Sequence, residues 1–281
     1  MRHTLYALLI ICVFAASTTG CKNNSEDKKT DPSAIKGSSA DQVHNDTLKG
    51  FMLAGVYFVH GYGGPEAFYD KIKKTINLDN SKAPFLTLLD SAYSKTLIFP
   101  FAQSPSEKVD SRNTLSSWFQ INNQNDFYLF LNNLKDSGFQ SHYELCRKAL
   151  DENGGAQANV GSIDLAKYHL PKGSELLLQF VKDNYNKFSA AGIKAWNIGL
   201  YVYVVTLGYG AEYANAHTGK SLILDQLKEA EKHYSDWKTY FSDFMLGREF
   251  SGVAKSENAA YKKTIEGMLT GHYSMYTHLP L

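Results

Sequence analysis

The sequence predicts a mostly α fold, a compact multi-helix domain that follows a lipoprotein signal and a flexible tether. From residue 47 onward, apolar residues recur three and four positions apart over much of the chain. Segments that alternate apolar and polar residues, as half-buried strands do, are scarce. No internal repeat of fixed period is present. We therefore expect residues 47–281 to form one α-helical domain.

The first twenty residues have the pattern of a secretion signal. Arg2 gives a positive start, and residues 5–16 form an apolar run that is too short to cross a membrane. Gly20 is followed directly by Cys21, which resembles the lipobox of bacterial lipoproteins. The resemblance implies that residues 1–20 are a lipoprotein signal peptide and that Cys21 is acylated, so that its acyl chains anchor the protein in a membrane.

Residues 21–46 predict a disordered tether. They are rich in Lys, Asp, Ser and Asn and contain no aromatic residue. Such a segment cannot bury enough apolar surface to offset the entropy lost on ordering. We expect a protein that is lipid-anchored in the cell envelope, on the outer membrane of a Gram-negative bacterium, and that faces the periplasm or the cell surface.

Charge and cysteine content narrow the classes of partner. The chain has 29 Lys and Arg and 28 Asp and Glu, so its charge is close to zero once Arg2 is removed. No basic cluster suggests a nucleic-acid partner. Cys12 lies in the signal and Cys21 at the expected anchor, which leaves Cys146 without a disulfide partner. We expect Cys146 to be buried among apolar side chains.

The stretch "YFVHGYGGPEAFYDKI" contains His-Gly-x-Gly-Gly, which is typical of the oxyanion loop of serine hydrolases. The chain has no serine in the G-x-S-x-G pattern of the nucleophile elbow. We therefore interpret the stretch as two helices joined by a glycine hinge. The first helix starts with Asp46 or Thr47 as its cap and ends near Gly61, and the second has Gly64 as its cap and Pro65 at its first position.

Two further patterns do not meet the requirements of a nucleotide site or a metal site. Gly219-Lys220-Ser221 is similar to the end of a phosphate-binding loop, but Ala214 stands where the leading glycine should be. We expect a loop and a helix N-terminus there. None of the nine histidines has metal-ligand spacing, and the four in the C-terminal part could meet only through folding, so we predict no metal and no cofactor. Those four are His217, His233, His272 and His278.

Four helical segments are expected in the body of the chain. Asn123 begins a helix that Gly138 ends, and Ser174 caps another. Residues 193–207 are apolar nearly all round and predict a buried central helix. The β-branched cluster near residue 204 keeps a strand as the alternative. Residues 221–247 continue with helical spacing, and a break and a new cap fall at Ser235-Asp236.

Four short motifs occur in a fixed order. They are Leu115-x-x-Trp118-x-x-Ile121, then Gly192-Ile193-x-Ala195-Trp196 with Gly208-Tyr209, then Trp237-x-x-Tyr240 with Gly247-Arg248-x-Phe250, and Ser274-x-Tyr276-x-x-Leu279-Pro280. Together they resemble the bacterial domain of unknown function 1266. The resemblance implies a shared fold but no activity. Family members carry aspartate and arginine where this chain has Asn197 and Leu200.

The candidate functional positions come from these motifs. They are Trp118, Trp196, Asn197, Tyr209, Trp237 and Arg248. We interpret the three tryptophans as core residues, with ligand stacking as the alternative. Arg248, just past a predicted helix end, is expected to bind carbonyl groups or the C-terminal segment. For Asn197 we expect a hydrogen bond between helices.

Three hypotheses for function remain open. The first is a non-enzymatic, lipid-anchored domain that binds another envelope protein. The second is an envelope hydrolase with an unrecognised site near His60 or Glu212. The third is a lipoprotein that binds a small molecule in a tyrosine-lined pocket. A cleft that gathers His, acidic and Arg side chains favours the hydrolase, and an exposed apolar patch on a closed core favours the protein-binding domain.

Overall fold

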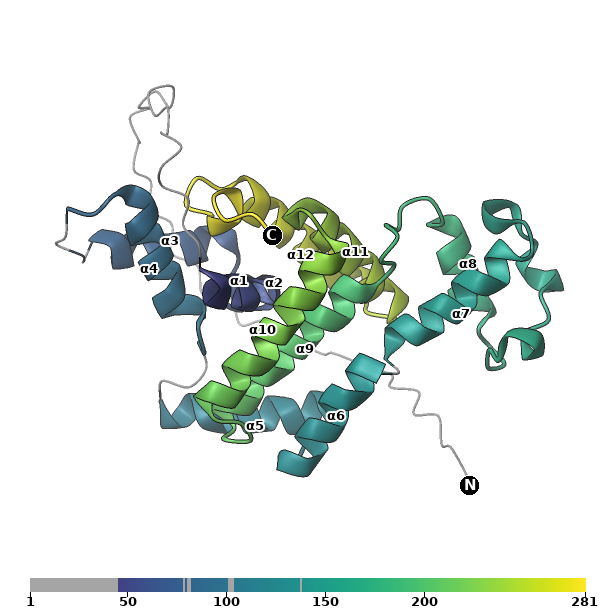
Figure 1. The fold of residues 1–281 in the computed structure, drawn as a ribbon, viewed down its shortest axis with the longest axis horizontal. Coiled ribbons are helices and arrows are strands. Elements are labelled where there is room, and N and C mark those ends of the chain that lie inside the picture. Colours follow the sequence, from purple (N-terminus) through teal and green to yellow (C-terminus); the bar gives the residue numbers. More distant parts are fainter. Residues whose placement is uncertain (1–44, 78, 80–81, 101–103, 137) are drawn as a thin grey trace. The chain divides into compact units, whose positions relative to one another are not determined.

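A computed structural model describes residues 45–77, 79, 82–100, 104–136 and 138–281 (Figure 1). The chain divides into residues 1–42 and 43–281, and the fold described here is that of the second unit. The expected signal peptide, the expected lipidation site Cys21 and residues 21–44 of the expected tether lie outside the described residues. Asn45 and Asp46 start the first helix.

Every regular element of the described ranges is a helix, which confirms the mostly α prediction. None of these helices is long and apolar enough to cross a membrane. The α-helices are α1 (Asp46–Met52), α2 (Gly55–Gly61), α3 (Pro65–Asn77), α4 (Phe85–Leu97), α5 (Pro105–Phe119), α6 (Gln124–Asp136), α7 (Phe139–Asp151), α8 (Glu175–Asp183), α9 (Lys194–Gly210), α10 (Ala216–His233), α11 (Trp237–Phe250) and α12 (Lys255–Thr270).

The helix α9 is the centre of the fold, as the apolar sequence of residues 193–207 predicts. It packs against α5, α6, α10 and α11, and Figure 1 shows it beside α10 in the middle of the molecule. Glycines on α9 let neighbouring helices approach: a Cβ at Gly199 would lie 2.8 Å from the Phe244 ring, and one at Gly208 would overlap the Phe127 ring. The alternative of a strand is wrong, because Lys194–Gly210 is an α-helix whose backbone hydrogen bonds are made within the helix and most of whose side chains are covered by neighbouring helices.

The single helix expected before Gly61 is two helices, α1 and α2. The break lies at Leu53-Ala54, where two tyrosine hydroxyls from distant parts of the sequence donate hydrogen bonds to backbone carbonyl oxygens. Tyr276 Oη donates to Met52 O (2.7 Å) and Tyr240 Oη donates to Leu53 O (2.9 Å). These tertiary hydrogen bonds favour the break, and no local pattern in the sequence predicts them.

The cap of the first helix differs by one residue from the prediction, whereas the glycine hinge before α3 is present. Asn45, one residue before the expected cap, accepts from Leu48 N. Gly63 and Gly64 both have φ of +98°, the left-handed region that favours glycine, and α3 then starts at Pro65. The glycine hinge is therefore confirmed.

Other predicted boundaries are right in part. Asn123 caps α6 by accepting from Asp126 N, and α6 ends at Asp136, so the helix expected between Asn123 and Gly138 is confirmed. Gly138 has φ of −63° rather than the left-handed conformation of a closing glycine, and it directly precedes α7. α10 starts at Ala216 with Asn215 as its cap, so the helix N-terminus expected near Gly219 is confirmed, whereas residues 219–221 lie inside the helix and not in a loop. Ser174 precedes α8 but makes no capping hydrogen bond through its side chain. The recapping at Asp236 is confirmed, because its carboxylate accepts from Thr239 N at 2.7 Å.

A second hydrophobic cluster forms where α7 and α8 pack together with three short 3-10 turns, η1 (Gly155–Gln157), η2 (Val160–Ser162) and η3 (Ala166–Tyr168). Cys146 is fully buried in this cluster, as expected. Phe250, the last residue of α11, belongs to the same cluster. The α7–α8 part is thus joined to the main core through the end of α11.

Candidate functional site

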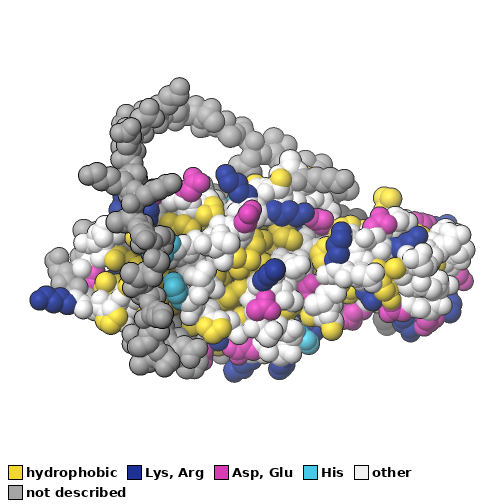
Figure 2. Space-filling model, turned by 90° about the horizontal axis from the view of Figure 1, so that it is seen from above, with side chains coloured by type: hydrophobic (Ala, Val, Ile, Leu, Met, Phe, Trp, Pro, Cys, Tyr) yellow, Lys and Arg dark blue, Asp and Glu magenta, His cyan; other side chains and the backbone are white. Residues whose placement is uncertain are grey.

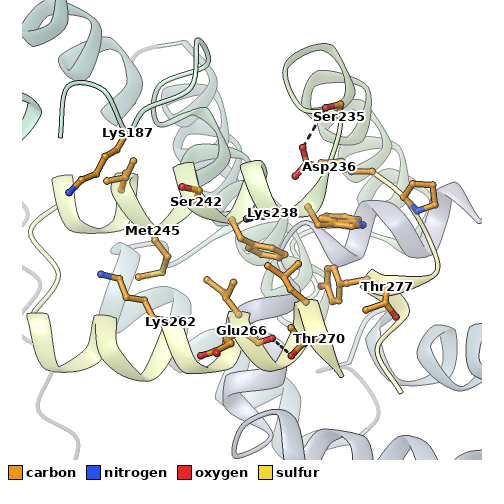
Figure 3. Close-up of a pocket in the computed structure, with 18 of the residues that line it drawn as sticks. Lys187, Ser235, Asp236, Lys238, Ser242, Met245, Lys262, Glu266, Thr270 and Thr277 are labelled. Atoms are coloured by element: carbon orange, nitrogen blue, oxygen red, sulfur yellow. Dashed lines mark hydrogen bonds between the residues drawn. The ribbon is translucent and has the colours of Figure 1, made fainter. Parts of the chain in front are cut away.

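A groove runs between α11 and α12, and the C-terminal residues close one end (Figure 3). Its volume is about 930 Å³, and it is open to solvent rather than enclosed. Trp237, Phe241 and Met245 line it from α11, and Ile265 and Leu269 line it from α12. Each set repeats every four residues, which places it on one face of its helix. The floor of the groove is therefore an apolar stripe supplied by two neighbouring helices.

The rim of the groove carries both signs of charge. Lys262 Nζ on α12 lies 2.7 Å from Glu249 Oε1 on α11, an ion pair that links the two helices. Lys238 and Glu266 also line the groove and are exposed. Figure 2 shows the same pattern on one face of the molecule, where hydrophobic side chains lie among basic and acidic ones. A ligand with an apolar stripe and charges of both signs matches this arrangement.

The C-terminal segment is held in place by buried hydrogen bonds. Trp237 Nε1 donates to Leu279 O at 2.7 Å, and Ser274 Oγ donates to Met268 O. The Trp237 ring also meets the Tyr276 ring edge-on, with centroids 4.9 Å apart. Trp237, one of the expected core tryptophans, is thus both buried and part of the groove floor.

The opposite end of the groove is bounded by Asn184 and Lys187, which follow α8. Figure 3 shows Lys187 and Thr277 at opposite ends. The connection from α8 to α9 is held by Asp243 of α11, whose carboxylate accepts from Ser189 N (3.1 Å) and from Ser189 Oγ. Asp243 is only 1% exposed. Burial raises its pKa, although the bonds from Ser189 oppose this shift.

The six candidate positions from the motifs are not brought together at one place. Trp196 and Arg248 lie close to each other, with the guanidinium 5.9 Å from the indole ring. Asn197 Nδ2 contacts Leu134 O of α6 at 3.5 Å, which is the expected contact between helices at a long distance. Tyr209 packs on Phe99 with centroids 3.9 Å apart.

Two interpretations of these positions are wrong. Trp118 is 38% exposed on α5 and is not a core residue. Arg248 lies in the last turn of α11 rather than past its end, and it binds side chains of α12 instead of carbonyls. Its Nη2 lies 3.1 Å from Glu257 Oε2 and its Nε donates to Asn258 Oδ1 at 3.0 Å.

The two residues of the hydrolase hypothesis have separate roles. The His60 ring packs against Tyr261 at 4.5 Å between centroids, and burial and the nearby Arg248 lower its pKa. Glu212 forms ion pairs with Lys108 (2.8 Å) and Arg112 (2.5 Å) of α5. No hydrogen bond or ion pair joins His60 to Glu212 in the described ranges.

No group of three or more His, Cys, Asp or Glu side chains that could hold a metal ion occurs within the described parts of the chain. The groove instead brings together apolar side chains and the polar groups on its rim. Sequence reasoning found Trp237 but missed the groove. The apolar spacing within α11 and α12 was a signal for it, although only their packing shows that the two stripes face one opening.

A family model described as protein of unknown function (DUF1266) matches residues 114–281. The chain belongs to this family. The match confirms the resemblance seen in the four motifs, and it contains α6 to α12 and every residue that lines the groove. No curated protein and no solved structure matches the chain significantly.

The folded unit of this DUF1266 protein extends beyond the matched region. Helices α1 to α4 precede residue 114, yet α1 packs on α10 and α2 packs on α12. Buried residues of α1 and α2 belong to the same hydrophobic core as α9 and α11. The N-terminal helices and the family region therefore share one core.

Proposed function

We propose that this DUF1266 protein is a lipoprotein, anchored through Cys21 in the cell envelope at the outer membrane, and that its domain is a non-enzymatic binding module. Its ligand is a segment of another protein held in the groove between α11 and α12. The observation that carries the proposal is the open apolar groove with charges of both signs on its rim.

The dimensions of the groove favour a protein segment. Pockets for small molecules measure about 300–1,000 Å³ and bury most of the ligand surface. This groove has a volume of about 930 Å³ but is open, so it accepts a ligand that continues beyond it. An amphipathic helix with apolar residues at positions i, i+3 or i+4, and i+7 fits such a groove between two helices.

The charges on the rim favour a protein over a polyanion. Three lysines and three acidic residues line the groove, so no net positive field attracts nucleic acid or anionic lipid headgroups. A protein segment with both acidic and basic side chains can pair with this rim. The six charged residues are Lys187, Lys238, Lys262, Asp236, Glu249 and Glu266.

The groove can be blocked without disturbing the core. Ser242 lines the groove and is exposed on α11, so Ser242→Trp fills the opening. Ala259 is exposed on α12 and does not line the groove, so Ala259→Trp is the matched control. Leu281 lines the groove, and an affinity tag is therefore inserted after Ser39 rather than at the C-terminus.

The test is a purification from detergent-solubilised membranes of cells that express the protein at its native level, with partners scored by mass spectrometry. We expect a stoichiometric partner that Ser242→Trp reduces at least tenfold and that Ala259→Trp leaves unchanged, with both variants as heat-stable as the parent. A photo-crosslinking residue at position 242 should map to one segment of that partner. Equal recovery with both tryptophan variants would show that the groove is not the binding site.

The lipid anchor is tested separately. Cys21→Ala should move the protein from the membrane fraction to the soluble fraction and abolish labelling by an alkyne-bearing fatty acid. A protein that stays labelled and membrane-bound after this substitution would refute anchoring through Cys21. This outcome would leave the groove proposal open, because every described residue that lines the groove follows residue 183.

A small molecule is the second candidate for the groove, since a volume of about 930 Å³ is within the range of such ligands. Native mass spectrometry of the purified protein distinguishes the two. A bound mass of a few hundred daltons that Ser242→Trp removes would indicate a small ligand and would overturn the protein-segment proposal.

A further inference from the structure

A second cluster of polar and aromatic side chains lies around Arg248, which is only 5% exposed. The guanidinium lies 3.7 Å from the centroid of the Tyr261 ring and 5.9 Å from that of Trp196. Two of its nitrogens are engaged by α12, Nε with Asn258 Oδ1 at 3.0 Å and Nη2 with Glu257 Oε2 at 3.1 Å. Arg248 is thus held in place by two side chains of α12.

Two hydrogen-bond donors beside this cluster lack a partner among the described residues. Tyr57 Oη and Trp196 Nε1 are both buried from solvent and hydrogen-bonded to no other group of the described chain. Trp196 as a whole is 5% exposed, and the two ring centroids are 6.3 Å apart. Buried polar groups are almost always paired. Two unpaired donors on adjacent rings therefore indicate a ligand.

The chemistry of the free groups selects an acceptor. An indole N–H can only donate. Burial raises the pKa of Tyr57 far above neutrality, so its hydroxyl keeps its proton and can donate as well. A water molecule that accepts both bonds would also have to place its own two protons on acceptors, and it would gain little from the positive charge of Arg248. A carboxylate has only lone pairs to offer and needs none.

We propose that Tyr57 and Trp196, beside Arg248, form a binding site for a small carboxylate, with one carboxylate oxygen accepting from both donors. The buried guanidinium favours the negative charge of the ligand, although it also pairs with Glu257, whose side chain is 34% exposed. This site lies outside the groove: neither Tyr57, Trp196 nor Arg248 lines it.

The rings around Tyr57 supply a wall for the apolar part of the ligand. The Tyr203 ring stacks on it at 4.4 Å between centroids, and Phe244 and Tyr261 meet it edge-on at 5.6 and 5.9 Å. Tyr203 and Tyr261 are half-buried, and His60, packed against Tyr261, is exposed. The cluster therefore reaches the surface near the end of α2, which gives a small carboxylate a way in.

The test follows the indole N–H of Trp196 by nuclear magnetic resonance in the full chain. Protein labelled with ¹⁵N-tryptophan gives three indole signals, and Trp196→Phe identifies the one from Trp196. Sodium acetate is titrated against sodium chloride at equal ionic strength. We expect acetate to shift the Trp196 signal with saturation, while the signals of Trp118 and Trp237 stay in place and chloride has no such effect.

Removal of a single hydroxyl then tests the shared acceptor. Tyr57→Phe keeps the ring and its packing and should weaken acetate binding at least tenfold. Tyr209→Phe, on α9 with its ring against Phe99, is the control and should bind as the parent does. A linear shift that chloride reproduces, or equal acetate affinity in the Tyr57→Phe and Tyr209→Phe variants, would overturn the proposal. An indole N–H that exchanges with bound water and ignores acetate would do the same.

Discussion

The hydrogen bond from Trp237 to the C-terminal segment gives the sharpest test of how the groove is built. Trp237 is 3% exposed, and its Nε1 donates to Leu279 O across 42 residues of sequence. Trp237→Phe removes the donor and leaves a buried carbonyl unpaired, which costs about 1–3 kcal/mol. The smaller ring loses packing against Tyr276 and its neighbours, for about 1 kcal/mol more.

The expected loss in the free energy of unfolding is therefore about 2–4 kcal/mol, which for a domain of this size lowers the Tm by about 5–15 °C. Urea unfolding monitored by circular dichroism measures this free energy. Trp118→Phe is the matched control, because Trp118 is 38% exposed and surface changes shift stability by about 0.5 kcal/mol or less. Hydrogen exchange should also show faster exchange at residues 275–281 in the Trp237 variant alone.

Equal costs for the two Trp→Phe substitutions would refute the reasoning, because they would mean that burial and the bond to Leu279 contribute nothing. A large loss of stability with unchanged exchange at residues 275–281 would refute a narrower claim, namely that Trp237 fixes the C-terminal end of the groove.

Three further predictions concern buried groups. Burial raises the pKa of Asp243, so its carboxyl group stays protonated to a higher pH in the folded state than in the unfolded chain. The free energy of unfolding of the parent, relative to that of Asp243→Asn, should therefore fall as pH rises above about 3.9 and level off beyond the raised pKa. A difference between the two proteins that does not change with pH would contradict this. Gly208→Ala should cost about 1–3 kcal/mol, because its Cβ would overlap an aromatic ring of α6, whereas Gly61→Ala has open space and should be neutral or slightly stabilising; urea unfolding of both variants decides. Burial raises the pKa of the Cys146 thiol to about 12, so iodoacetamide at pH 8 should modify its peptide only after unfolding, as mass spectrometry would show; rapid labelling of the native protein would contradict its burial.

The groove and the shared core limit where this protein can be tagged or truncated. Pro280 and Leu281 line it, so a tag or fusion at the C-terminus lies at the proposed binding site. The N-terminal helices cannot be trimmed to the family region either, since α1 and α2 share its core. Truncation at residue 114 would expose the buried faces of α9, α10 and α12 that these helices cover.

The sequence by itself determined the features that depend on neighbouring residues. The apolar run of residues 193–207 predicted the buried helix α9, and the glycine pair before Pro65 predicted the hinge to α3. The four motifs predicted the family. Periodicity, caps and turn glycines act over one or two helical turns, so they can be read from the chain directly.

Only the tertiary structure decided where the helices break and what they enclose. The break at Leu53 depends on a bond from Tyr240, 187 residues away, and the groove depends on a bond from Trp237 to Leu279. The exposure of Trp118 and the unpaired donor of Trp196 also follow from which helix packs against which. These contacts join residues that no local pattern relates, because a helix specifies its own apolar face but not the neighbour that covers it.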